Sequence, residues 1–296
     1  MRIGAIEAGG TKFVCGIGNE HGEIEDRISF PTEPPGITLV KVVSYFKDKQ
    51  VDAIGIGSFG PIDIRPGSPT FGYVTTTPKP GWGNYNFLGT LMREFPVPYG
   101  WDTDVNAAAY GEATWGAAKG LKSCLYYTVG TGIGIGVYSE GKLVHGLVHP
   151  EGGHVLTRRH ADDDFAGICP YHGDCLEGMA AGPAIEARWK VKGDELPAEH
   201  RAWEIEAFYI AQSITGAILL NSPEKVILGG GVMQQSQLFP LIRNAVKQNL
   251  NGYINANEIL QQMDDYIVPP GLGGHAGLYG ALALGLSALK RQVTLM

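Results

Sequence analysis

Apolar runs separated by glycine turns dominate the first 60 residues of the chain. Residues 2–30 read as three short strands, two of them apolar, and the turn Gly9-Gly10-Thr11 separates the first two. Apolar runs bounded by turn residues are typical of β-strands. Apolar residues at helical spacing over 37–46 then precede another apolar run at 51–58. The pattern predicts a β-meander followed by a helix and a further strand, and therefore a mixed sheet.

The same pattern begins again in the second half of the chain. Two strand-like runs, 123–130 and 133–140, are joined by a turn at Thr131-Gly132, and a third run follows at 225–230. A repeat of about 120 residues is too long for a solenoid and indicates two similar α/β domains. We expect one domain over residues 1–117 plus 276–296 and a larger one over 118–275.

Helical patterns occur in both halves. They lie at 86–94, 105–118, 182–191, 201–220, 238–249 and 276–290. The run 266–274 reads as one more strand before the last helix. We expect that last helix to return to the first domain.

Composition narrows the class of protein. Hydrophobic residues make up 44% and charged residues 18%, which is typical of a globular chain and excludes general disorder. The net charge of −7, from 23 basic and 30 acidic residues, argues against nucleic acid as the main partner. The longest apolar stretch, 276–289, is too short to span a bilayer, and no apolar core of signal-peptide length opens the chain. We expect a cytoplasmic protein without a membrane partner.

Two glycine hairpins are candidate phosphate sites. The segment Glu7–Lys12 is a strand end, a glycine turn and a second strand that carries a hydroxyl and an ammonium group, and Gly130–Gly134 repeats this arrangement. Backbone N–H groups in such turns can bind phosphate, and threonine hydroxyls can donate to it. A third cluster, Gly229–Gly231, ends an apolar strand where a nucleoside could lie. Each segment taken alone could equally be an ordinary turn or loop.

Two aspartates stand where an apolar strand meets a helix rich in small residues. Asp102 and Asp104 precede Asn106 and a run of alanines. Helix N-capping would account for one carboxylate. The second carboxylate is then a candidate general base.

Together these residues resemble the ROK sugar kinases, and most closely their fructokinase branch. The resemblance runs nearly end to end. It is carried by the two hairpins, Asp104 with the residues after it, the run Glu151-Gly152-Gly153-His154, the following Cys/His cluster, and Cys175-Leu176-Glu177. It implies the actin-like ATPase (ribonuclease H-like) fold, with two α/β domains and an active site in the cleft between them.

The resemblance also implies roles for individual residues. Asp104 would accept the proton of the attacking hydroxyl. The sugar would contact Thr103, Glu151, His154 and Glu177. ATP, with Mg²⁺, would contact Gly9, Gly10, Thr11, Lys12, Thr131, Gly132, Pro183, Gly229, Gly230, Gly231 and Val232. A homodimer is expected by the same resemblance.

Cysteine and histidine usage points to a metal. Cys15 and Cys124 lie in strand-like runs and are expected as buried thiols. The spacing Cys-x2-His-x2-Cys, preceded by a further histidine, suits a tetrahedral structural Zn²⁺. Its ligands would be His154, Cys169, His172 and Cys175. The alternative is a histidine-rich surface loop, and we expect His149, His160 and His200 to be ordinary surface histidines.

Two positions depart from the family pattern. Glu7 stands where many members have Asp, and Thr103 stands where the family's glucokinases have Asn. The family asparagine hydrogen-bonds a sugar hydroxyl, so its absence disfavours glucose. We therefore expect ATP-dependent phosphorylation of fructose to fructose 6-phosphate. The alternatives are a glucokinase or mannokinase, a silent sugar-binding protein, and a sugar-sensing regulator, which would need a helix-turn-helix ahead of a hairpin that here begins by residue 7.

Overall fold

The computed structural model describes residues 1–294 and folds the apolar runs of the first hundred residues into a mixed sheet. Its strands are β1 (Ile3–Ala8), β2 (Lys12–Gly18), β3 (Ile24–Pro31), β4 (Ala53–Ser58) and β7 (Tyr99–Thr103). Strands β1, β2 and β3 pair antiparallel, whereas β1, β4 and β7 pair in parallel, in the order β3-β2-β1-β4-β7. The expected meander followed by a helix and a parallel strand is confirmed.

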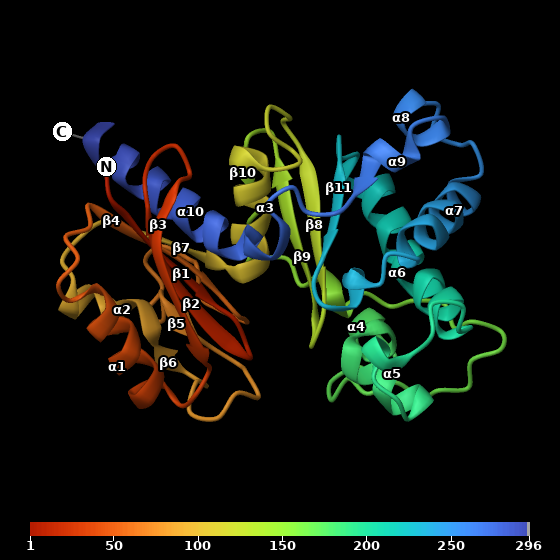
Figure 1. Ribbon diagram of the computed structural model, residues 1–296, viewed down its shortest axis with the longest axis horizontal. Coiled ribbons are helices and arrows are strands. Elements are labelled where there is room, and N and C mark those ends of the chain that lie inside the picture. The colour runs from red at the N-terminus through yellow and green to blue at the C-terminus, as the bar shows by residue number, and fades with distance from the viewer. Residues whose placement is uncertain (295–296) are drawn as a thin grey trace. The chain divides into compact units, whose positions relative to one another are not determined.

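Helices cover both faces of this sheet (Figure 1). They are α1 (Pro35–Phe46), α2 (Phe87–Glu94), α3 (Asp104–Trp115) and α10 (Ala276–Thr294). Alternate residues of β1 point to opposite faces, so Ile6 packs in the core with α1 and α2 while Ala5 packs against α10. The last helix thus covers the sheet formed by the first residues of the chain.

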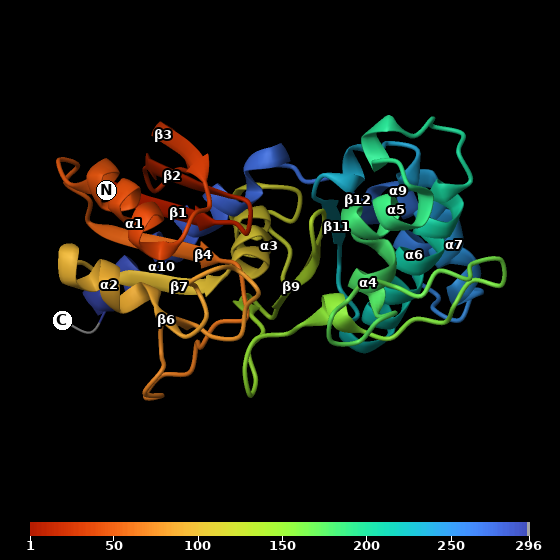
Figure 2. The same cartoon turned by 90° about the horizontal axis from the view of Figure 1, so that it is seen from below.

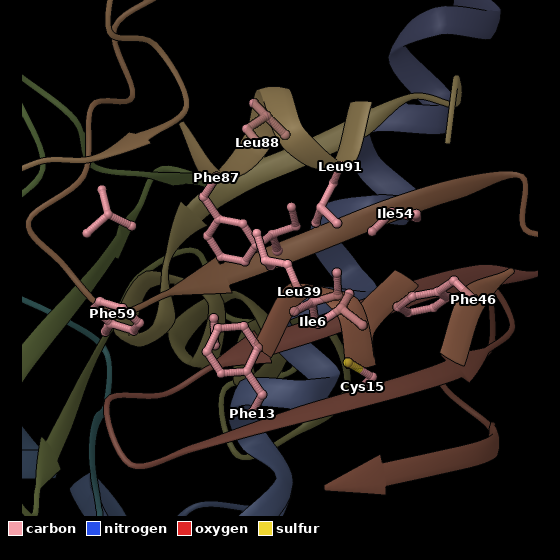
Figure 3. Packing of buried hydrophobic residues seen from close by; sticks show 14 of the residues in the cluster. Ile6, Phe13, Cys15, Leu39, Phe46, Ile54, Phe59, Phe87, Leu88 and Leu91 are labelled. Carbon is pink, nitrogen blue, oxygen red and sulfur yellow. The ribbon is translucent and has the colours of Figure 1, made fainter. Parts of the chain in front are cut away.

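The core between the sheet and α1 and α2 is strongly aromatic (Figure 3). Phe13, Phe59 and Phe87 converge there with aliphatic side chains from β1, β4 and both helices. Trp82 is 1% exposed, and its ring lies 5.6 Å from that of Phe13. Trp82 belongs to the Pro- and Thr-rich excursion between β4 and α2, which also contains the short strands β5 (Tyr73–Val74) and β6 (Tyr85–Asn86). The excursion is therefore anchored in the core.

A second mixed sheet repeats the first in kind. Four of its five strands are β8 (Cys124–Val129), β9 (Ile133–Ser139), β11 (Val226–Gly229) and β12 (Ile267–Val268), in the order β9-β8-β11-β12. The pair β8 and β9 is antiparallel, and β8, β11 and β12 are parallel. The strand expected over 266–274 is much shorter, because Pro269 and Pro270 lack the N–H groups that would continue the ladder.

The remaining helices lie to one side of this second sheet in both views (Figures 1 and 2). They are α4 (Leu176–Ala180), α5 (Gly182–Trp189), α6 (Ala202–Asn221), α7 (Leu238–Leu250), α8 (Asn257–Leu260) and α9 (Met263–Tyr266). Single 3₁₀ turns occur at Gly152–His154, Gly193–Glu195, Val232–Gln234 and Gly273–His275. No helix within residues 1–294 has the length and apolar character required to cross a membrane.

The chain divides into two compact units. Unit 1 contains Met1–Gly120, Lys142–Pro150 and the residues from His275 onward, and unit 2 contains Leu121–Gly141 and Glu151–Gly274. The segment Lys142–Pro150, which begins with β10 (Lys142–Leu143), thus groups with unit 1 although it follows the second glycine hairpin in sequence.

A buried carboxyl group in unit 2 is a source of instability. Glu206 lies in the second turn of α6, and among the described residues its Oε1 has no hydrogen-bond partner. Burial raises the pKa of Glu206 well above its ordinary value, although the positive charge of Arg188 opposes the shift. When folding raises the pKa of a carboxyl group, the protein becomes less stable as the pH rises above the pKa of the unfolded state, here near 4.5. The loss continues until the pH reaches the pKa of the folded state.

We therefore expect Glu206→Gln to raise the free energy of unfolding at pH 8 by about 1 kcal/mol, because the neutral amide avoids the charge. The gain should shrink as the pH falls toward 5. Urea unfolding at both pH values measures it, with Glu204→Gln, an exposed residue of the same helix, as the control. An equal effect of both substitutions, or a gain independent of pH, would contradict this expectation.

Candidate active site

The first glycine hairpin joins β1 to β2 as expected. The Gly9 N–H donates to the Lys12 carbonyl at 3.0 Å, which closes the turn. Thr32, which directly follows β3, holds the turn from outside, because its hydroxyl donates to the Gly9 carbonyl at 2.7 Å and its N–H to the Thr11 carbonyl at 2.9 Å. The hairpin is thus fixed by its own backbone and by the neighbouring strand.

Glu7, at the end of β1, does not extend into open solvent. The Leu278 N–H donates to its carboxyl group, and a Cβ added at Gly277 would lie 2.7 Å from Glu7 Oε1. Burial raises the pKa of Glu7, while the charge of Lys12 opposes that shift. Glu7 therefore meets the first turn of α10, where N–H groups without helical partners favour a carboxylate.

Asp104 begins α3 at the carboxyl end of β7. The preceding Thr103 is the N-cap, and its buried hydroxyl accepts from the Asn106 N–H at 3.2 Å. Asp104 is half-buried, and its Oδ1 accepts from the Val105 N–H at 2.9 Å. The positive end of a helix stabilises an ionised carboxylate. The N-terminus of α3 thus places the partial positive charge of its backbone N–H groups beside the Asp104 carboxylate.

Helix N-capping was the alternative role for one of the two aspartates, but Asp102 does not cap α3. Its buried Oδ1 accepts from the Thr103 N–H and from Asn106 Nδ2, both at 2.8 Å. Its Oδ2 lies 2.7 Å from His145 Nε2, and this hydrogen bond raises the pKa of His145. Sequence reasoning missed His145, because nothing near it in the chain indicates a partner 43 residues away.

The histidines expected at the surface are not exposed. His149 is buried, and its Nε2 accepts from the Ile62 N–H at 3.0 Å. His160 is half-buried against the ring of Phe208. His200 is half-buried too, and its Nδ1 accepts from the Ala202 N–H at the start of α6. The expectation was wrong because backbone N–H groups in loops and at helix ends require acceptors, which these imidazoles supply.

In unit 2 the structure brings two of the glycine segments together with the start of α5. The Gly182 N–H donates to the Gly130 carbonyl at 2.7 Å, so the start of α5, with Pro183, adjoins the second hairpin. A Cβ at Gly130 would lie 3.6 Å from the Gly231 nitrogen. Gly230 has φ +94°, and a Cβ added to it would lie 2.3 Å from the carbonyl oxygen of Val129. Only glycine fits this position. One backbone-lined surface results.

Two of the expected sugar residues adjoin the second hairpin. Glu177 Oε2 accepts from the Ile133 N–H at 2.9 Å, and Glu177 Oε1 lies 4.0 Å from His154 Nε2. Glu151 is exposed just before the 3₁₀ turn, and its carbonyl accepts from the His154 N–H. Glu177 therefore links the hairpin to helix α4 and to the cysteine–histidine loop.

The four expected metal ligands come together in that loop. Their ligand atoms all lie within 4.8 Å of one another. His154 Nδ1 is 3.5 Å from Cys175 Sγ and 3.8 Å from Cys169 Sγ, and His172 Nδ1 is 3.6 Å from Cys169 Sγ. A tetrahedral Zn²⁺ with bonds of about 2.3 Å to sulfur and 2.0 Å to nitrogen separates such atoms by about 3.5 Å. The donor set fits zinc in both chemistry and spacing.

Comparisons with known proteins agree with this arrangement. The model of the ROK family matches residues 3–288. The chain belongs to the ROK family. It is 51% identical over 290 residues to the fructokinase of Pediococcus pentosaceus, covering 98% of this chain and 99% of the other. It is 42% identical over 295 residues to the fructokinase of Streptococcus mutans serotype c, covering 98% and 97%.

A solved ROK structure supports the fold. The crystal structure of the ROK hexokinase from Thermus thermophilus superposes with a TM-score of 0.79 at 27% identity, covering 98% of this chain and all of the other. The expected fold class, two α/β units of the actin-like ATPase type, is thereby confirmed.

Proposed function

We propose that this ROK protein transfers the terminal phosphoryl group of ATP to D-fructose and forms fructose 6-phosphate. The observation that carries the proposal is the near full-length similarity to two proteins named fructokinase, combined with a half-buried Asp104 at the N-terminus of α3. Phosphoryl transfer depends mainly on positioning and charge neutralisation, for which backbone hairpins and one carboxylate are suited.

In this mechanism Asp104 takes the proton of the primary hydroxyl of the sugar. The hydroxyl oxygen forms a bond to the terminal phosphorus of MgATP as the bond from that phosphorus to the bridging oxygen breaks, and MgADP leaves. The position of Asp104 at the N-terminus of α3, where its Oδ1 accepts from the Val105 N–H, supports this role.

We assign the nucleotide to the glycine segments. The phosphates would contact the hairpin Gly9–Lys12 and the turn Thr131-Gly132, and the adenosine would lie against Gly229–Val232 beside Pro183. The hydrogen bond from Gly182 to Gly130 and the approach of Gly231 support the part of the assignment in unit 2. The sugar hydroxyls would contact Thr103, Glu151, His154 and Glu177.

We further propose a structural Zn²⁺ on His154, Cys169, His172 and Cys175. A bound zinc would supply a fixed cross-link between the loop and the start of α4. His154 would ligate through Nδ1, which leaves Nε2 directed toward Glu177. His154 would thus bind the metal through Nδ1 and orient the carboxylate of Glu177 through Nε2.

A coupled assay tests the main proposal. Purified protein with ATP, Mg²⁺ and a panel of hexoses should release ADP fastest with fructose, and the product should be fructose 6-phosphate. Faster turnover of glucose or mannose would move the assignment to a glucokinase or mannokinase, and no ADP release with any hexose would favour a sugar-binding protein.

Sugar preference should depend on Thr103. Thr103→Asn keeps a good helix cap and adds an amide donor beside Asp104, so we expect kcat/KM for glucose relative to fructose to rise about tenfold. Thr103→Ser, which keeps the hydroxyl, should retain the fructose preference. Competition between the two sugars at equal concentration measures both variants, and an unchanged ratio in Thr103→Asn would remove Thr103 from sugar selection.

We also propose a cytoplasmic homodimer. None of the four cysteines forms a disulfide among the described residues, which suits a reducing compartment. Light scattering of the purified protein would give the mass of a dimer if this holds, and that of a monomer if it does not.

A further inference from the structure

Lys79 lies directly over the first glycine hairpin. A Cβ added at Gly10 would lie 3.0 Å from Lys79 Cε and 3.3 Å from Lys79 Nζ. The ammonium group therefore occupies the space that any other residue at position 10 would fill. Nothing in the local sequence suggests this, because the two residues are 69 positions apart.

The backbone of Lys79 is anchored beside the hairpin. The Trp82 N–H donates to the Lys79 carbonyl at 3.1 Å, and the Lys79 N–H donates to Thr77 Oγ1 at 3.3 Å. Trp82 is in turn buried on Phe13 of β2, and its indole N–H donates to the Glu33 carbonyl at 2.9 Å. The loop that carries Lys79 is thus fixed to the same strand pair that forms the hairpin.

Among the described residues, Lys79 differs from two other lysines of unit 1 in having no carboxylate partner. Lys41 and Lys49 in the same unit pair with Glu33 and Asp26, whereas within residues 1–294 Lys79 forms no ion pair with a carboxylate. Lys79 is also half-buried. A partly desolvated ammonium group is costly unless an anion accompanies it.

We propose that Lys79 contacts the phosphate chain of the nucleotide at the hairpin Gly9–Lys12. This inference rests on the proposed kinase function and adds a catalytic residue to it. The ammonium group donates to phosphate oxygens and neutralises charge there, as lysine does at other phosphate sites. Gly10 is then required because it leaves room for Lys79 as well as for the phosphate.

Binding experiments on the full chain test the proposal. Lys79→Met should weaken MgADP binding by about 10- to 100-fold, as expected for a lost hydrogen bond from a charged donor. Adenosine, which has no phosphate, should bind equally well to the variant and to the wild type. Lys79→Arg should restore most of the affinity for MgADP. Isothermal titration calorimetry measures all three, and thermal unfolding verifies that each variant is folded.

Lys47→Met is the matched control. Lys47 is exposed at the C-terminal end of α1, whereas Pro35 at the start of that helix adjoins Gly81 of the Lys79 loop. A twelve-residue helix, about 18 Å long, separates the two ends. The control should bind MgADP as the wild type does. If Lys79→Met and the control bind MgADP alike, or if adenosine and MgADP weaken together, the proposal is wrong.

A double-mutant cycle tests the role of Gly10. Gly10→Ala should cost more MgADP affinity in the wild type than in the Lys79→Met background, because its methyl group acts partly by displacing Lys79. Equal costs in both backgrounds would contradict that explanation.

The Lys79 proposal and the fructokinase proposal can fail independently of each other. A wild type that binds MgADP but phosphorylates no fructose would overturn the fructokinase proposal and leave the Lys79 test intact. An active enzyme in which Lys79→Met binds MgADP normally would overturn only the Lys79 proposal, and a wild type that binds no MgADP would overturn both.

Discussion

Asp104→Asn is expected to lower kcat for sugar phosphorylation by about 10² to 10⁴, the usual effect of removing a general base. The amide cannot accept the hydroxyl proton, although its oxygen can still accept from the Val105 N–H as the carboxylate does. The cap of α3 is supplied by Thr103, so the fold should be retained. The measurement is steady-state ADP release at saturating ATP and fructose.

Two further measurements make this result specific. MgADP should bind to the Asp104→Asn variant about as tightly as to the wild type, since the carboxylate acts on the sugar. Asp48→Asn, a charge-matched change at an exposed position of the same unit, should leave kcat unchanged. Near-normal turnover in Asp104→Asn would remove Asp104 from the mechanism.

Cys175→Ser should lose both the zinc and a large part of the stability of unit 2. Metal bound only by the folded chain stabilises it by mass action, and about 4 kcal/mol corresponds to a ligand present at 1,000 times its Kd. For a domain of this size that is a fall in Tm of about 8 to 16 °C. Elemental analysis of protein purified without added metal should find one zinc per chain in the wild type and none in the variant.

Cys124→Ser separates loss of a thiol from loss of the metal. Cys124 is buried in β8 and lies outside the ligand cluster, so this variant should keep its zinc whatever its stability. A strong chelator should lower the Tm of the wild type toward that of Cys175→Ser. Zinc-free wild-type protein of unchanged Tm would show that the cluster is an ordinary loop.

The zinc loop has a consequence for catalysis. Cys175 directly precedes α4, whose Glu177 accepts from the Ile133 N–H at the second hairpin. Loosening the start of α4 should therefore disturb the hairpin as well as the sugar carboxylate. A zinc bound there would thus support the proposed site without taking part in phosphoryl transfer.

Much of the fold and part of the site follow from patterns confined to a few residues. The first hairpin is predictable because two apolar runs flank Gly9-Gly10-Thr11, and the start of α3 because Thr103 can cap a helix rich in small residues. The metal cluster follows in the same way, since Cys169, His172 and Cys175 are close in sequence. In each case backbone sterics and short-range hydrogen bonds select the structure.

Other features of the site depend on contacts between distant segments. The pairing of Asp102 with His145 and the position of Lys79 over Gly10 join residues from separate elements. Glu7 is another case, because its local sequence gives no sign that α10, some 270 residues later, covers it. Charged side chains have many possible partners within reach of an unfolded chain, and only the packing of the helices on the sheet selects one. Local patterns therefore determine where the hairpins and Asp104 lie in the chain, and long-range packing determines which charges accompany them.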